Sequence, residues 1–183
     1  MTDRRVVTDR RIVIGHYVRR FLTSLSRRAP EPADERWAES RLSAPEVALF
    51  RRLSNVDRRH LVHSARIVER ELGPGADPVW VRAALLHDVG KFDAHLGVPG
   101  RVVATLLAAA LGDERVRVWA STAGWKGQLG RYQMHGELGA AAIRAAGGPE
   151  EAAIWSELHH HRDRFAGAAI APEFLDVLDA ADH

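Results

Sequence analysis

Residues 83–91 read Ala-Ala-Leu-Leu-His-Asp-Val-Gly-Lys, an apolar helical run that ends in ionisable side chains. Neighbouring residues of a helix project about 100° apart, so His87 and Asp88 can reach one cation that lies off the helix edge. Buried polar groups need partners, and an imidazole nitrogen with a carboxylate oxygen suits Mn, Fe, Zn or Mg ions. The alternative interpretation is a hydrogen bond between the two side chains at the helix end.

Helical patterns extend to both sides of this stretch. Ser43-Ala-Pro-Glu46 is the signature of a helix N-terminus, and the next helix begins at Asn55 or Asp57 and stops at Gly73-Pro74-Gly75. Further helices are expected over 79 to about 89, 99–111, 136–146, 149 to about 160, and from 172 to the C-terminus. Val118–Gly130 is the least regular part, and no run alternates as a strand would. We therefore predict an all-α fold of about eight to ten helices.

Charge divides the chain into a basic N-terminal arm, residues 1–32, and one domain, residues 33–183. Residues 1–28 hold eight Arg and two Asp, whereas the remainder carries a net charge of −4. Residues 12–25 have the apolar spacing of an amphipathic helix, which either packs on its own domain or contacts a membrane surface weakly through residues 10–28. The acidic body argues against nucleic acid as a partner.

Composition excludes several other classes of protein. A chain of 183 residues with 46% hydrophobic residues is long enough for one buried core. Cysteine is absent, which excludes disulfides, thiolate metal sites and cysteine nucleophiles. No apolar run reaches the ~20 residues of a membrane span, and no signal peptide is evident. A cytoplasmic location is the expectation.

Ten histidines are many for this length, and several recur near predicted helix ends. His60 and His63 precede the His87–Asp88 pair, His135 opens a later helix, and His159-His160-His161 ends the next. Asp179 and Asp182 lie near the C-terminus. His16 and His95 are interpreted as ordinary surface or core residues.

This ordered set resembles the HD superfamily of metal-dependent phosphohydrolases over about residues 57–182. The stretch Leu85–Lys91 matches the family motif closely, and residues 135–140 and 159–163 resemble the HD-GYP branch. Gly136 stands where that branch has proline, and no Gly-Tyr-Pro follows His161. The arrangement is therefore more similar to small stand-alone HD proteins of the actinobacterial type.

The resemblance implies an HD-domain helical bundle, here with an additional N-terminal amphipathic helix, and a site for two divalent metal ions (Fe, Mn, Mg or Zn). The first ion would be held by His60, His87, Asp88 and Asp182. Asp88 would bridge to the second, held by His135, His159 and His160. Asp88 and Lys91 are the expected catalytic residues, Lys91 as a point charge toward a substrate phosphate.

Two of these ligands have competitors in the sequence. Between residues 60 and 72, Leu61, Ala65 and Val68 share an apolar helical face. His60 flanks this face and His63 lies nearly opposite, so we choose His60, although the 24-residue gap from His63 to His87 is also found in the family. Asp182 fits the family's terminal Ala-Asp pair, with Asp179 as the alternative.

The implied activity is hydrolysis of a small phosphate ester or nucleotide by a metal-activated water. The same ligand set also occurs in di-iron HD-fold oxygenases, and a third alternative is a non-catalytic HD domain that binds a nucleotide signal or a partner. Arg101, at an expected helix N-terminus, is placed near the site. Residues 124–127 are expected as a loop over the pocket or a surface turn.

Overall fold

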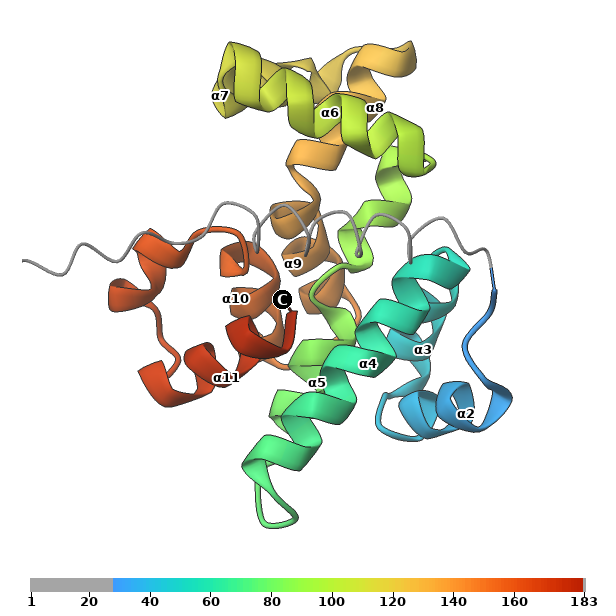
Figure 1. Ribbon diagram of the computed structural model, residues 1–183, viewed down its shortest axis with the longest axis vertical. Helices are drawn as coiled ribbons and strands as arrows, with labels where there is room; N and C mark the ends of the chain where they lie inside the picture. The colour runs from blue at the N-terminus through green and yellow to red at the C-terminus, as the bar shows by residue number, and fades with distance from the viewer. Residues whose placement is uncertain (1–27, 183) are drawn as a thin grey trace, which may run out of the picture.

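The computed structural model describes residues 28–182, which form ten α-helices and three 3₁₀ helices with no strand among them (Figure 1). In chain order they are α2 (Pro32–Ser40), α3 (Ala44–Arg51), α4 (Asn55–Leu72), α5 (Val79–Leu86), η1 (Val89–Ala94), α6 (Val98–Leu111), α7 (Asp113–Arg117), η2 (Val118–Ser121), α8 (Gly124–Gln133), α9 (His135–Ala145), α10 (Glu150–Leu158), η3 (Arg162–Gly167) and α11 (Pro172–Asp182). The all-α prediction is confirmed. The amphipathic helix expected over residues 12–25 lies outside the described residues.

The main core lies where α4, α5, α9, α10 and α11 pack together in the lower part of Figure 1. Helix α4 buries Leu61, Ala65 and Val68, the apolar face expected from its spacing. Helix α5 is buried on nearly every side, and Ala83–Leu86 are at most 2% exposed. A helix that is apolar all round belongs in a core, so the end of α5 delivers His87 and Asp88 into the protein interior.

Helices α6, α7 and α8 form a separate lobe, at the top of Figure 1, with a small core of its own. Ala104, Val116 and Leu129 are its buried residues. His95, whose φ of 50° is left-handed, ends η1 before the chain turns into α6. The lobe therefore begins ten residues after Asp88, and its helix α8 packs against η1 and α9.

Two expectations about secondary structure were wrong, one about the end of a helix and one about a segment expected to be irregular. The helix predicted to run to about Val89 ends at Leu86, and the chain tightens there into η1. Val118–Gly130, expected to be irregular, instead contains η2 and the start of α8. Glycine lowers helix propensity by about 1 kcal/mol, but Gly130 is needed because a Cβ there would come within 2.2 Å of the Ala120 nitrogen.

The helix N-terminus predicted at Ser43–Glu46 is present, and α4 begins at Asn55, the first of the two starts expected. Ser43 and Glu46 form a capping box at α3, and Ser54 caps α4 by accepting a hydrogen bond from the Asp57 nitrogen. Within residues 28–182 no single helix is both long and apolar enough to cross a membrane. The adjoining segments Val79–Ala94 and Val98–Leu111 pass that test only as a pair, and they are bent by 91°.

Candidate metal centre

Five helices each contribute at least one predicted ligand to a single cluster beside the lobe. The residues are His60 from α4, His87 and Asp88 from the end of α5, His135 from the start of α9, His159 and His160 from the end of α10, and Asp182 from the last turn of α11. They are far apart in sequence and side by side in the fold. Asp88 lies between two groups, which we name the Asp182 group and the triple-histidine group.

The Asp182 group consists of His60, His87 and Asp182. Oδ1 of Asp182 lies 2.8 Å from Nε2 of His60 and 3.2 Å from Nε2 of His87. The same two nitrogens lie 4.0 and 3.8 Å from Oδ2 of Asp88. Asp182 is only 4% exposed although it lies near the chain terminus, so this carboxylate is held inside the protein.

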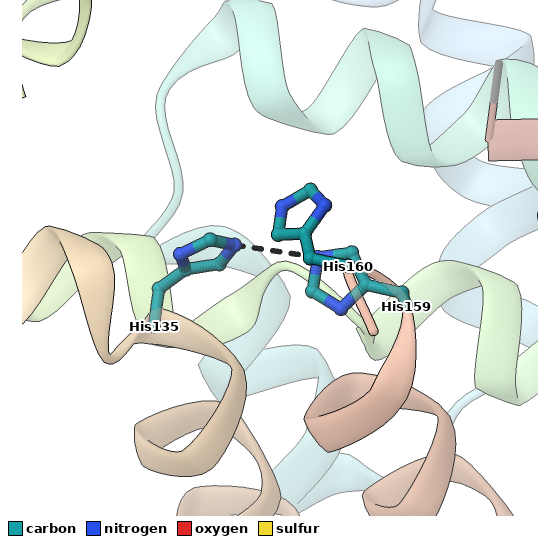
Figure 2. A group of neighbouring side chains, drawn as sticks. All are labelled: His135, His159 and His160. Carbon is teal, nitrogen blue, oxygen red and sulfur yellow. Dashed lines mark hydrogen bonds between the residues drawn. The ribbon is translucent and has the colours of Figure 1, made fainter. Parts of the chain in front are cut away.

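The triple-histidine group consists of His135, His159 and His160 (Figure 2). Nε2 of His135 lies 3.3 Å from Nε2 of His159, and each nitrogen lies 3.5 Å from Oδ1 of Asp88. His160 is more exposed, and its ring lies 3.9 Å from that of His159, centroid to centroid. Two ligands about 2.1 Å from one ion lie roughly 3 to 4 Å apart, which is the spacing found here.

The backbone fixes which nitrogen of each buried ring carries the proton. Nδ1 of His87 donates to the Ala84 carbonyl at 3.0 Å, Nδ1 of His135 to Tyr132 at 2.6 Å, and Nδ1 of His159 to Ser156 at 2.7 Å. A carbonyl oxygen only accepts, so each Nδ1 must hold a hydrogen. When these rings are neutral, each Nε2 therefore carries a lone pair. A hydrogen bond from Nδ1 that orients the ring in this way is typical of histidines that bind a metal through Nε2.

Asp88 Oδ1 is the atom that ordinary hydrogen bonding leaves unexplained. It is buried, and within residues 28–182 it has no hydrogen-bond partner. The atoms nearest to it include the Nε2 lone pairs of His135 and His159. Three acceptors directed at one another are costly, whereas a cation between them satisfies all three. The donor set therefore fits a metal ion.

Electrostatics supports the same assignment of charges. Burial opposes the ionised form of Asp88 and Asp182, but neighbouring cationic groups, Lys91 for Asp88 and His87 for Asp182, hold the pKa of both carboxyls well below the ordinary value. Burial and the charge of Lys91 lower the pKa of His135 to about 3. Two carboxylates and a neutral His135 are the protonation states that metal binding requires, whereas His87, whose pKa is raised by Asp88 and Asp182 against the effect of burial, must release its proton when an ion binds.

Lys91 lies one turn after His87 and donates to Oδ2 of Asp88. Burial disfavours its charge, yet the carboxylate of Asp88 raises the pKa of Lys91, so the ammonium persists. Arg101, predicted near the site, makes two hydrogen bonds to the carboxylate of Asp57, one of 2.7 Å. Asp57 is 4% exposed, and its charge also acts on Lys91.

A cavity of about 410 Å³ opens over the triple-histidine group. Its wall includes Tyr132, Gln133, Glu157 and His161, together with Thr105 of α6. This volume suits a small molecule and provides a route from solvent to the ligands. A second hollow, about 430 Å³, has charged walls in which Arg51 pairs with Glu39 and Arg58 with Glu35.

The competing residues lie elsewhere. His63 is exposed on α4, and Asp179 pairs with Arg162. Residues 124–127 form the first turn of α8, and Trp125 there is 59% exposed. Ser156, which the sequence pattern does not single out, contacts the backbone of two of the ligand-bearing segments.

These buried His and Asp groups have the donor atoms and the spacing to hold a metal ion. No protein-family model, curated protein or solved structure matches the chain.

Proposed function

We propose that this protein is a metal-dependent hydrolase of small phosphate esters or nucleotides. The observation that carries the proposal is the convergence of two Nε2 lone pairs on the buried, unsatisfied Oδ1 of Asp88. The other carboxylate oxygen faces His60, His87 and Lys91. With ring nitrogens beside both of its oxygens, Asp88 would contact an ion on either side, and Lys91 donates a hydrogen bond to Oδ2.

The residues divide as the resemblance to HD phosphohydrolases implies. His60, His87 and Asp182 would hold one ion, His135, His159 and His160 the other, and Asp88 would contact both. Such ions lower the pKa of water and offset the charge of a phosphoryl group. Because the donors are mainly imidazoles, we expect Fe, Mn or Zn in preference to Mg.

The remaining groups would act on the substrate itself. Lys91 has a stable positive charge beside Asp88, where it would bind a phosphate oxygen as a point charge. The Nδ1 hydrogen bonds of His87, His135 and His159 keep the rings from turning. The cavity above them would accept the rest of a small substrate and bring in water.

Metal analysis of freshly purified protein, followed by a substrate panel, tests this proposal. The panel contains phosphomonoesters, phosphodiesters and nucleotides, each assayed with Mn²⁺, Fe²⁺, Zn²⁺ or Mg²⁺, in air and without oxygen. Metal-dependent release of phosphate or nucleoside that does not require oxygen supports the proposal. Bound iron with oxygen-dependent loss of substrate would make the protein an oxygenase instead. Tight nucleotide binding without turnover would make it a binding protein.

A further inference from the structure

Ser156 lies where three ligand-bearing segments meet. Its side chain is fully buried in α10, one turn before His159. Its Oγ lies 2.7 Å from the carbonyl oxygen of His87 and 3.1 Å from that of Gly136. Its own carbonyl accepts the Nδ1 hydrogen of His159 at 2.7 Å. One serine therefore contacts the segments that carry His87, His135 and His159.

The contact with His87 has a consequence for Asp88. Helix α5 ends at Leu86, so the His87 carbonyl belongs to the last turn, where carbonyls lack helical partners. Ser156 provides a donor to this buried oxygen. The peptide that it holds is the one that joins His87 to Asp88, so the hydroxyl restrains the carboxylate that lies between the two groups.

The surroundings leave room for this hydroxyl and little more. A Cβ at Gly139 would lie 2.5 Å from the Oγ of Ser156 and 3.1 Å from the nitrogen of Gly90. The close approach of α9 to α10 and η1 thus depends on a residue without a side chain. Ser156 fits a gap of fixed size between them.

We propose that Ser156 is a positioning residue that holds both groups in register around Asp88; this inference rests on the proposed metal site. It does not contact the ions. Its backbone carbonyl orients the His159 ring whatever the side chain, while its hydroxyl sets the direction of the His87–Asp88 peptide and contacts the Gly136 carbonyl next to His135. Its loss should therefore weaken metal binding on both sides of Asp88, whereas loss of one ligand weakens one side.

The test is calorimetric titration of chelator-treated full-length protein with Mn²⁺ and Zn²⁺. Ser156→Ala should weaken both binding steps by about 10 to 100-fold, the cost typical of residues that orient metal ligands. Ser64→Ala is the matched control: Ser64 is equally buried and its Oγ bonds the carbonyl of His60 at 3.1 Å, but within one helix. That variant should bind metal like wild type.

Two further variants separate positioning from stability. Ile143→Val removes a core methyl group from α9 and should lower the melting temperature without changing metal affinity. Gly139→Ala keeps the hydroxyl but displaces it and should give an intermediate loss, which also serves if Ser156→Ala does not fold. Wild-type affinity in both Ser156→Ala and Gly139→Ala would overturn the inference. Wild-type protein that binds no metal would overturn both proposals, and metal binding without hydrolysis would overturn only the proposed activity.

Discussion

Both groups beside Asp88 contain imidazole rings, but they differ in the charged side chains that surround those rings. In the Asp182 group, a carboxylate lies 2.8 and 3.2 Å from two imidazole nitrogens. Burial opposes a charge on His87, yet Asp88 and Asp182 raise its pKa. In the triple-histidine group, burial and Lys91 lower the pKa of His135 to about 3.

This difference indicates which group forms stabilising contacts in the absence of a metal ion. Without metal, a proton on His87 can bridge to Asp182, so the Asp182 group forms hydrogen bonds within the protein. His135 and His159 face each other with lone pairs, and protonation of His135 is disfavoured. We therefore expect the Asp182 group to be preformed and, because it offers the carboxylates of Asp88 and Asp182 to one cation, to bind its ion first with release of the His87 proton, while the triple-histidine group depends on a cation for its stability.

The largest effect should come from the residue that both groups share. Asp88→Asn keeps the shape of the side chain but removes its charge and makes one of its two oxygens an amide nitrogen. Both ions should be lost, and hydrolysis should fall by at least about 100-fold, since even residues that only orient ligands cost up to that much. Elemental analysis and phosphate release measure the two effects. Asp163→Asn, at an exposed carboxylate close to the histidine run, is the control. Unchanged metal content in Asp88→Asn would exclude Asp88 as a bridge.

A smaller and selective effect should come from ligands that belong to one group. His159→Ala should reduce the metal content from two ions to one and leave the tighter binding step in place. His60→Ala should instead weaken the tighter step, because His60 contacts Asp182. Titration with Mn²⁺ separates the two steps, and His159→Ala should affect only the weaker one.

His63→Ala is the control for His60→Ala, since both histidines lie on α4 and His63 is exposed. It should retain the metal content and affinity of wild type. If His63→Ala loses metal and His60→Ala does not, the assignment of the inward face of α4 is wrong. If His60→Ala and His159→Ala lose the same binding step, the cluster holds a single ion.

The sequence predicts those parts of the site that depend on residues close together in the chain, and it does not predict those that depend on contacts between distant segments. The apolar run before His87 and the helical face beside His60 are local patterns, and they lead to the residues that the fold brings together. The end of α5 at Leu86 and the helix over Gly124–Gln133 were missed because tertiary packing overrides local propensity there. Ser156 was missed because its role depends on two carbonyls from distant segments.

The smallest effect is a pH dependence of stability in the metal-free protein. An unfolded chain titrates its histidines near pH 6.5, whereas the pKa of His135 in the fold is about 3. Between these values the unfolded state binds the extra proton, so stability falls as the pH falls, by up to about 1.4 kcal/mol per pH unit for this residue. Burial also lowers the pKa of His60, which acts in the same direction, whereas the raised pKa of His87 changes stability mainly above pH 6.5, outside this interval.

Urea unfolding of chelator-treated protein between pH 6.5 and pH 4.5 measures this slope. Asp88 and Asp182, whose folded pKa values are lowered, change stability below this window, between those values and the pKa of about 3.9 that Asp has in an unfolded chain. His135→Gln keeps a polar side chain of similar size but cannot take up the proton, so its stability should depend less steeply on pH. The corresponding change at exposed His63, His63→Gln, should leave the slope as in wild type. Saturating Mn²⁺ should steepen the wild-type slope near pH 6.5, because the ion binds only the folded, deprotonated cluster and displaces the proton that His87 holds there. Equal slopes for wild type and His135→Gln would mean that the His135 ring reaches solvent in the metal-free protein, and the contrast between the two groups would then disappear.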